Sequence, residues 1–264
     1  MTEASPGPAT AGRPAARPRS AGFARRNAGL LWTLGTAALF AGMWGFVRHS
    51  AGLGLAGLTR DLSGESPFYD PGAPAITAIM FAHMAAGAGL TLLAPVQLIG
   101  PLRRARPRLH RGLGSTMIAL GLATGAGGVV YALGRGTTGG PFMDLSSTVY
   151  GLLILLAAVE TFRHGRARRW PAHRRWGLRL SVLAIASWLY RMHYVIWDLI
   201  ADGAGTTPDM TGPFDRFQAW GFYLTYLALL EIWLQRERRR ARAPGASRGP
   251  RPTRTGAEAA RPGA

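Results

Sequence analysis

Residues 74–100 read PAITAIMFAHMAAGAGLTLLAPVQLIG, and this stretch decides the fold. It contains no Asp, Glu, Lys or Arg, and as an α-helix it is long enough to cross a hydrocarbon layer about 30 Å thick. Apolar segments of similar length recur along the 264 residues. With the first stretch, they cover residues 28–47, 74–100, 113–133, 145–162, 177–200 and 217–234. The sequence therefore predicts an all-α fold, a polytopic transmembrane helix bundle with about six spanning helices.

The arginines predict how this bundle is oriented. Twenty-five of the 31 basic residues lie before the first segment, after the second, after the fourth and after the last. Because loops with an excess of arginine face the cytoplasm, both chain ends are expected there, in the plasma (inner) membrane of a bacterium. Residues 1–27 and 236–264 are rich in Pro, Ala, Gly and Arg, so we expect two disordered basic tails around a membrane domain at 28–235.

Composition and context exclude several classes of protein. The chain has no Cys, which excludes disulfides, iron–sulfur clusters and thiolate catalysis. Its net charge of +18 is concentrated between apolar runs. The expected partner is therefore a bilayer with anionic head groups and not a nucleic acid. Residues 52–57, GLGLAG, match the dinucleotide fingerprint, but they fall in a predicted loop and not between a strand and a helix, so no nucleotide site is expected.

The second segment carries the clearest polar candidate. His83 lies near its middle, and Gly87 and Gly89 follow it. Gln97 lies 14 residues further on, which places it within about 40° of the face of His83 and about 21 Å along the helix. Two interpretations stay open. The histidine could hold a flat ring cofactor, or it could bond to a neighbouring helix where glycines allow close packing.

The fifth segment carries Arg191 and His193. Arg191 lies about 18 Å beyond Arg179 along a helix, so it is expected to need a partner or a wet cavity. His193 is expected either to pair with His83 across helices or to form a simple hydrogen bond. Small residues at helical spacing in the third segment predict close packing: Gly121, Gly125 and Gly128.

Two predicted cytoplasmic loops resemble each other. Residues 104–111 read RARPRLHR and residues 166–176 read RARRWPAHRRW, each leading into a helix. The repeat places His110 and His173 at similar depth, where imidazoles could ligate a metal and arginines could hold phosphates or haem propionates. The same residues would also suit interfacial anchors. Carboxylates near these ends are expected to form structural ion pairs: Glu160 and Glu231 with Arg175 or Arg179.

These residues also form a joint pattern. It consists of His83-x3-Gly87, Gln97, the run LRRARPRLHRGLG at 102–114, and His173-Arg174-Arg175-Trp176 followed by Arg179 and Arg191. The pattern resembles the bacterial membrane family catalogued as domain of unknown function 2306, over roughly residues 74–195. The resemblance implies a membrane protein. It implies no activity, because the family is uncharacterised.

Three functions stay open, and whether the chain is an enzyme is left open with them. The first is a redox protein that holds a b-type haem or is linked to a quinone and a membrane redox partner. The others are a transporter or binding protein for small molecules or lipids, and an assembly factor for a membrane complex. The first is favoured by analogy with helix bundles in which histidines clamp a haem. The candidate cofactor-contacting residues are His83, Gln97, Arg111, Arg174, Trp176, Arg179 and Arg191. The candidate metal ligands are His83, His110, His173 and His193.

Overall fold

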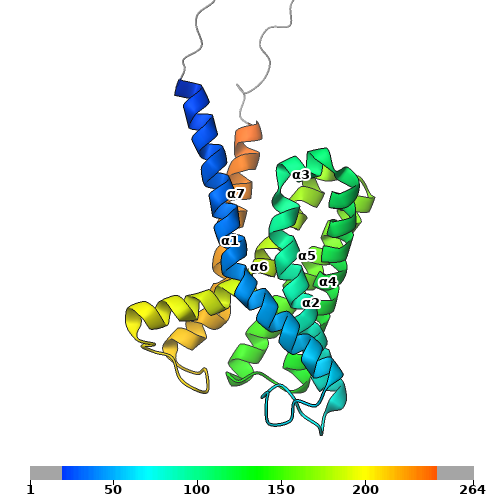
Figure 1. The fold of residues 1–264 in the computed structure, drawn as a ribbon, viewed down its shortest axis with the longest axis vertical. Coiled ribbons are helices and arrows are strands. Elements are labelled where there is room, and N and C mark those ends of the chain that lie inside the picture. The colour runs from blue at the N-terminus through cyan, green and yellow to red at the C-terminus, as the bar shows by residue number, and fades with distance from the viewer. Residues whose placement is uncertain (1–19, 243–264) are drawn as a thin grey trace, which may run out of the picture. The chain divides into compact units, whose positions relative to one another are not determined.

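The computed structural model describes residues 20–242, with side chains over residues 34–240 except residue 36. All regular structure in this range is helical, as the sequence predicts, and Figure 1 shows its arrangement. The helices are α1 (Ser20–Thr59), α2 (Pro74–Leu98), α3 (Gly100–Ala105), α4 (Pro107–Gly134), α5 (Gly140–Arg166), α6 (Trp170–Ala201) and α7 (Pro213–Arg242).

The helices begin where proline favours a start. Proline fixes the backbone angle of the first turn and lacks an N–H that would go unbonded there. Six of the seven helices in the described range have it in their first two positions: Pro74, Pro101, Pro107, Pro141, Pro171 and Pro213. Pro101 begins the short helix α3, which the sequence did not predict.

Five of the six predicted apolar segments lie within helices, and the segment at 74–100 runs past the end of α2 at Leu98. The outer two helices extend into the predicted tails. α1 begins at Ser20 and α7 ends at Arg242. The remainder of both predicted tails, residues 1–19 and 243–264, lies outside the described residues. The chain forms two compact units, Met1–Gly42 and Met43–Ala264, and α1 contributes to both.

Four helices of the second unit form a closed ring. α2 packs on α4, α4 on α5, α5 on α6, and α6 returns to α2, while α7 packs against α5 and α6. Their shared core is built from aliphatic residues of the ring and aromatic residues of α7. Its members with 1% exposure or less include Leu90, Ala94, Ala157, Leu180 and Tyr223. Each helix of the ring therefore buries one stripe of its surface, as in up-and-down four-helix bundles.

Glycines bring the backbones of α4 and α5 into contact. A Cβ added at Gly125 would lie 2.9 Å from the carbonyl oxygen of Gly151, and one added at Gly151 would lie 3.0 Å from that of Gly125. Gly121 faces Ala158 and Leu180 in the same way, at ordinary contact distance. The prediction of close packing by the glycines of the third segment is confirmed here.

The fingerprint-like glycines also serve packing, and the loop expected at residues 52–57 is wrong. These residues belong to α1. A Cβ at Gly54 would lie 2.7 Å from the backbone of Ala85, and one at Gly57 would overlap the ring of Phe81. The missing side chains therefore allow the end of α1 to lie directly on α2.

Three helices of the described range are long and apolar enough to cross a membrane: α2, α4 and α5. The six spans expected from the sequence are therefore not shown. Polar residues interrupt the apolar runs of the last two helices, among them Arg191 and His193 in α6 and Gln218 and Glu231 in α7. The chain is an all-α protein with several candidate membrane spans.

The contact between α4 and α5 makes a stability prediction. Gly125→Ala should lower the free energy of unfolding by about 1–3 kcal/mol, because the new methyl group has no room. Gly112→Ala lies in the same helix with nothing within 4 Å of its added Cβ. It should leave stability unchanged or raise it by up to about 1 kcal/mol through helix propensity. Reversible unfolding in mixed micelles measures both, and equal effects would contradict the packing argument.

Candidate functional site

His83 lies against the face of α4 that carries no side chains. Its Nδ1 lies 2.8 Å from the carbonyl oxygen of Thr124. A Cβ added at Gly128 would lie 3.1 Å from the Cε1 atom of the ring, and one at Gly127 would lie 3.0 Å from the Cβ atom of His83. The glycines therefore let the half-buried imidazole reach a backbone carbonyl of the neighbouring helix.

His173 repeats this contact on another pair of helices. Its Nδ1 lies 2.9 Å from the carbonyl oxygen of Thr161 in α5. A Cβ added at Gly165 would lie 3.1 Å from that Nδ1 and 3.3 Å from Cε1. We call each arrangement a histidine dock: a ring held on a Thr-x3-Gly segment, at Thr124–Gly128 for His83 and Thr161–Gly165 for His173.

The docks fix the chemical form of both rings. A carbonyl oxygen can only accept, so each Nδ1 carries the proton and donates it. The Nε2 atom of the neutral ring then holds a free lone pair. Histidines that ligate metals are commonly oriented in this way, with the second nitrogen bonded to a carbonyl or carboxylate. The sequence repeat drew attention to His173 but gave no sign of a common acceptor.

The other two candidate metal ligands lie elsewhere. His110 lies in the first turn of α4, half-buried and close enough to His173 to interact electrostatically. His193 bonds to α7 through both ring nitrogens, so of the two alternatives for this residue the hydrogen bond is observed and the pairing with His83 is not. Within the described residues, no group of three or more His, Cys, Asp or Glu side chains is placed to hold a metal ion.

Two candidate arginines are bound by carboxylates of α7. Arg179 donates through Nε and Nη2 to Glu231 at 2.6 and 2.9 Å, and its guanidinium lies 4.5 Å from the centre of the Trp176 ring. Arg174 donates to Glu237 at 2.7 Å. The expected pair of Arg179 with Glu231 is confirmed. These arginines and Trp176 hold α7 on α6, and their charges are already compensated.

The carboxylate of Glu160 has different partners from those expected. It accepts from Arg163 and lies 3.3 Å from Nε2 of His164, both on its own helix. Its expected pairing with Arg175 or Arg179 is therefore wrong. A residue three or four positions along a helix is reached more easily than one on a neighbouring helix.

Arg191 and Gln97 are the candidate residues with the fewest polar partners. Arg191 donates to the carbonyl oxygen of Ser187 at 3.0 Å, and its guanidinium lies 4.7 Å from the ring centre of Phe46 in α1. None of the ion pairs in the described range includes Arg191. It is close enough to His83 to interact electrostatically. Gln97 lies against Gly114, and its buried Nε2 has no partner among the described residues.

Arg111 is placed differently from both. It is exposed in the second turn of α4. An exposed guanidinium at the start of a helix suits contact with anionic head groups, which is the role expected for the arginine clusters.

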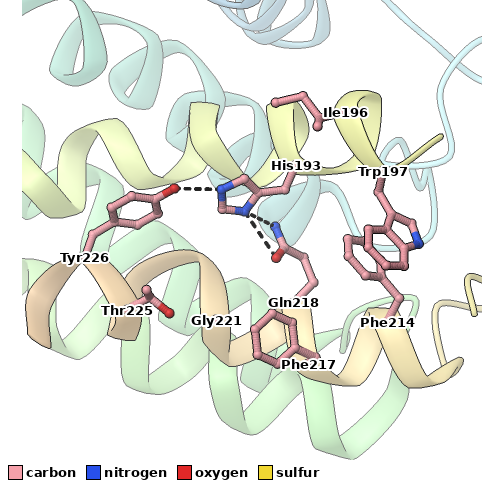
Figure 2. A pocket seen from close by; sticks show the side chains of 9 residues that line it. All are labelled: His193, Ile196, Trp197, Phe214, Phe217, Gln218, Gly221, Thr225 and Tyr226. Carbon is pink, nitrogen blue, oxygen red and sulfur yellow. Dashed lines mark hydrogen bonds between the residues drawn. The ribbon is translucent and has the colours of Figure 1, made fainter. Parts of the chain in front are cut away.

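A pocket lies between α6 and α7, and Figure 2 shows its lining. Its volume is about 350 Å³. One wall is the stacked pair Trp197 and Phe214, whose ring centres are 4.6 Å apart at 7°. Its polar side is His193, whose Nε2 lies 2.7 Å from the hydroxyl of Tyr226 and whose Nδ1 lies 2.8 Å from the amide nitrogen of Gln218. The sequence singled out His193 but none of its partners.

The sequence did not single out Asp215, which follows the pocket residue Phe214 in the chain. The side chain of Asp215 is fully buried. The carboxylate accepts from the hydroxyl of Tyr194 at 2.8 Å and from the backbone N–H groups of Thr207 and Gly212 at 2.9 and 3.1 Å. It lies in the first turn of α7, where the helix dipole favours a negative charge. An acid two residues after a helix-starting proline is the sequence signal that could have revealed it.

Replacing this carboxylate should loosen the connection between α6 and α7. Asp215→Asn should lower the free energy of unfolding by about 2–3 kcal/mol, because an amide cannot accept from all of these donors. Asp202→Asn is the matched control. Asp202 is exposed with a φ of 48°, a conformation that Asn also adopts. Thermal unfolding in detergent measures both, and similar midpoints for the two variants would contradict this role.

Comparison with known proteins identifies the family. The model of the family described as "Predicted membrane protein (DUF2306)" matches residues 80–212, just over half of the chain. No curated protein and no solved structure matches it. The matched segment contains both docks and all of the candidate residues, and it ends immediately before α7. The chain therefore belongs to this family of predicted membrane proteins of unknown function.

Proposed function

We propose that this protein is a redox protein of the membrane that holds a b-type haem on a docked histidine. The observation that carries the proposal is the pair of histidine docks. In each, the ring donates through Nδ1 to a threonine carbonyl and keeps its Nε2 lone pair free. Such a haem would supply one-electron transfer at the iron.

Two features around His83 support this proposal. Its ring is fixed by α4, so the direction of its Nε2 lone pair is set before any ligand binds. Arg191 lies within electrostatic reach and has no carboxylate partner in the described range. Its guanidinium would compensate an anionic propionate at a depth where an unpaired charge is costly. Arg174 and Arg179 are less suited to this task, because Glu237 and Glu231 already neutralise them.

His173 would be the second docked ligand. His110 lies near it, so the end of the bundle where α4 and α6 begin presents two imidazoles and the exposed Arg111. The residues of this end would bind iron through nitrogen and anionic substituents through guanidinium groups.

The haem proposal predicts an absorption spectrum. Protein purified from haem-replete cells should show a Soret band that shifts on addition of dithionite and fades in His83→Ala. Gly128→Val, which pushes the ring from its carbonyl, should weaken the band. Gly112→Val, in open space on the same helix, should keep it. His164→Ala, whose ring lies beside Glu160, should also keep it. A colourless, iron-free preparation from such cells would contradict the proposal.

We further propose six spans, with both chain ends in the cytoplasm of a bacterium and the protein in its plasma membrane. The distribution of arginine supports this topology. α1, α6 and α7 would join the three apolar helices as spans. The polar residues of α6 and α7 would be tolerated because they bond to one another, as Arg179 does to Glu231 and His193 to Gln218.

The topology can be mapped by cysteine labelling without background reaction of native thiols, because the natural chain has no Cys. Single cysteines at Ser63 and Ala204 should react with a membrane-impermeant maleimide in intact cells. Those at Ala105 and Ala167 should react only after permeabilisation. All four positions are exposed, so accessibility to the reagent decides the result. Labelling of Ser63→Cys and Ala167→Cys from the same side would refute the proposed topology.

A further inference from the structure

The pocket between α6 and α7 has a polar side whose hydrogen bonds have a defined direction. The amide nitrogen of Gln218 lies 3.3 Å from the carbonyl oxygen of Tyr190, which can only accept. This contact orients the amide, so its second N–H points to Nδ1 of His193, 2.8 Å away. The amide oxygen is farther from Nδ1, at 3.2 Å. Figure 2 shows His193 held between Gln218 and Tyr226.

The same order of donor and acceptor continues from Gln218 through the imidazole of His193 to Tyr226. Because Nδ1 accepts from Gln218, the neutral imidazole carries its proton on Nε2. Nε2 then donates to the oxygen of Tyr226, 2.7 Å away. The hydroxyl proton of Tyr226 is therefore left to donate to something else. No other hydrogen bond of Tyr226 occurs among the described residues, and Tyr226 lines the pocket. His193 is thus the opposite tautomer to His83 and His173.

The remaining walls are apolar and aromatic apart from the side chain of Thr225. Trp197 and Phe214 form a stacked pair, and the ring of Phe217 lies over Gly221, where a Cβ would be 3.1 Å from it. Ile196 and Phe217 are 52% and 66% exposed at the rim. Large apolar residues also continue along the same part of α6, where Leu199 is 84% exposed. Such a surface is entered from lipid more readily than from water.

We propose that this pocket binds a lipid-soluble molecule with a flat ring and a ring carbonyl, of the quinone class, and that Tyr226 donates its hydroxyl proton to that carbonyl. A volume of about 350 Å³ accommodates one ring system. Flat aromatic walls favour a flat ligand by stacking. The pocket is mostly apolar, and its hydroxyl donors are Tyr226 and Thr225. The free proton of Tyr226 favours a ligand with an acceptor oxygen, because a hydrocarbon would leave that hydroxyl unbonded.

This site is independent of the proposed haem. None of its residues belongs to a histidine dock, and its ligand need not exchange electrons with iron. The two proposals therefore fail separately. Gly128→Val should leave binding in this pocket unchanged, and Tyr226→Phe should leave the Soret band unchanged.

The experiment compares two ligands of one shape. Menadione has a methylnaphthalene ring with two carbonyls, and 2-methylnaphthalene has the ring alone. Equilibrium dialysis against the full-length protein in nanodiscs, corrected with empty nanodiscs, measures both affinities. Tyr226→Phe should weaken menadione binding about three- to tenfold, the value of one neutral hydrogen bond, and leave 2-methylnaphthalene binding unchanged. Tyr131→Phe, on α4, is the control and should change neither.

A second variant guards against a folding defect. Ile196→Trp lies at the exposed rim, so it should fold normally, and it should reduce the binding of both ligands by narrowing the entrance. Three results would overturn the proposal: no binding of menadione by the natural protein, equal losses for both ligands in Tyr226→Phe, or unchanged menadione binding in either Tyr226→Phe or Ile196→Trp.

Discussion

Helices of this protein approach one another where a side chain is missing, and most of the architecture depends on that constraint. Two helices with ordinary side chains keep their axes about 8–10 Å apart, and glycine allows a closer approach. At Gly125 and Gly151 the approach brings backbone against backbone. At Gly57 it admits the ring of Phe81, and at Gly128 and Gly165 it admits an imidazole. Glycines at helix contacts therefore close the four-helix ring, attach the end of α1 and orient two histidines.

The seventh helix is held differently, by charge and by hydrogen bonds at its two ends. At one end, Arg179 and Arg174 form ion pairs with Glu231 and Glu237. At the other, the buried Asp215 gathers donors from Tyr194 and the preceding loop. Between these ends, α7 contributes aromatic residues to the core and the free hydroxyl of Tyr226 to the pocket. Polar interactions of this kind are directional, so they fix the register of α7 against α6 as well as its position.

The sequence predicted the helices well because long apolar runs and starting prolines are local signals. It predicted that Glu231 pairs with Arg175 or Arg179, and Arg179 is the partner observed, because charges at matching depth have few other partners. It failed where the partner is a backbone atom or where local polarity is misleading. No residue type reveals that the carbonyl of Thr124 will accept from His83, because the acceptor is common to all residues. The glycine-rich end of α1 was taken for a loop, since glycine disfavours helices in water, yet packing on Phe81 compensates that cost. The buried position of Asp215 was not predicted, because its donors are a tyrosine hydroxyl on α6 and two backbone N–H groups.

The histidine docks have a consequence for how the bundle responds to acid. An imidazole bears a proton on Nδ1 in this tautomer, and an imidazolium bears one there as well. The bond to the threonine carbonyl is therefore available in both charge states, so a change of protonation at Nε2 does not require the ring to turn. The bond of His83 and His173 to a threonine carbonyl therefore places no demand on the second ring nitrogen. For His193 the opposite holds: protonation would place two donors, the ring Nδ1 and the Gln218 amide, against each other. The amide would then have to rotate and present its oxygen, which would break its bond to Tyr190. The bundle therefore contains two kinds of histidine. The hydrogen bond of His83 and His173 to a carbonyl does not depend on a proton at Nε2, whereas the hydrogen bonds of His193 depend on which nitrogen carries the proton.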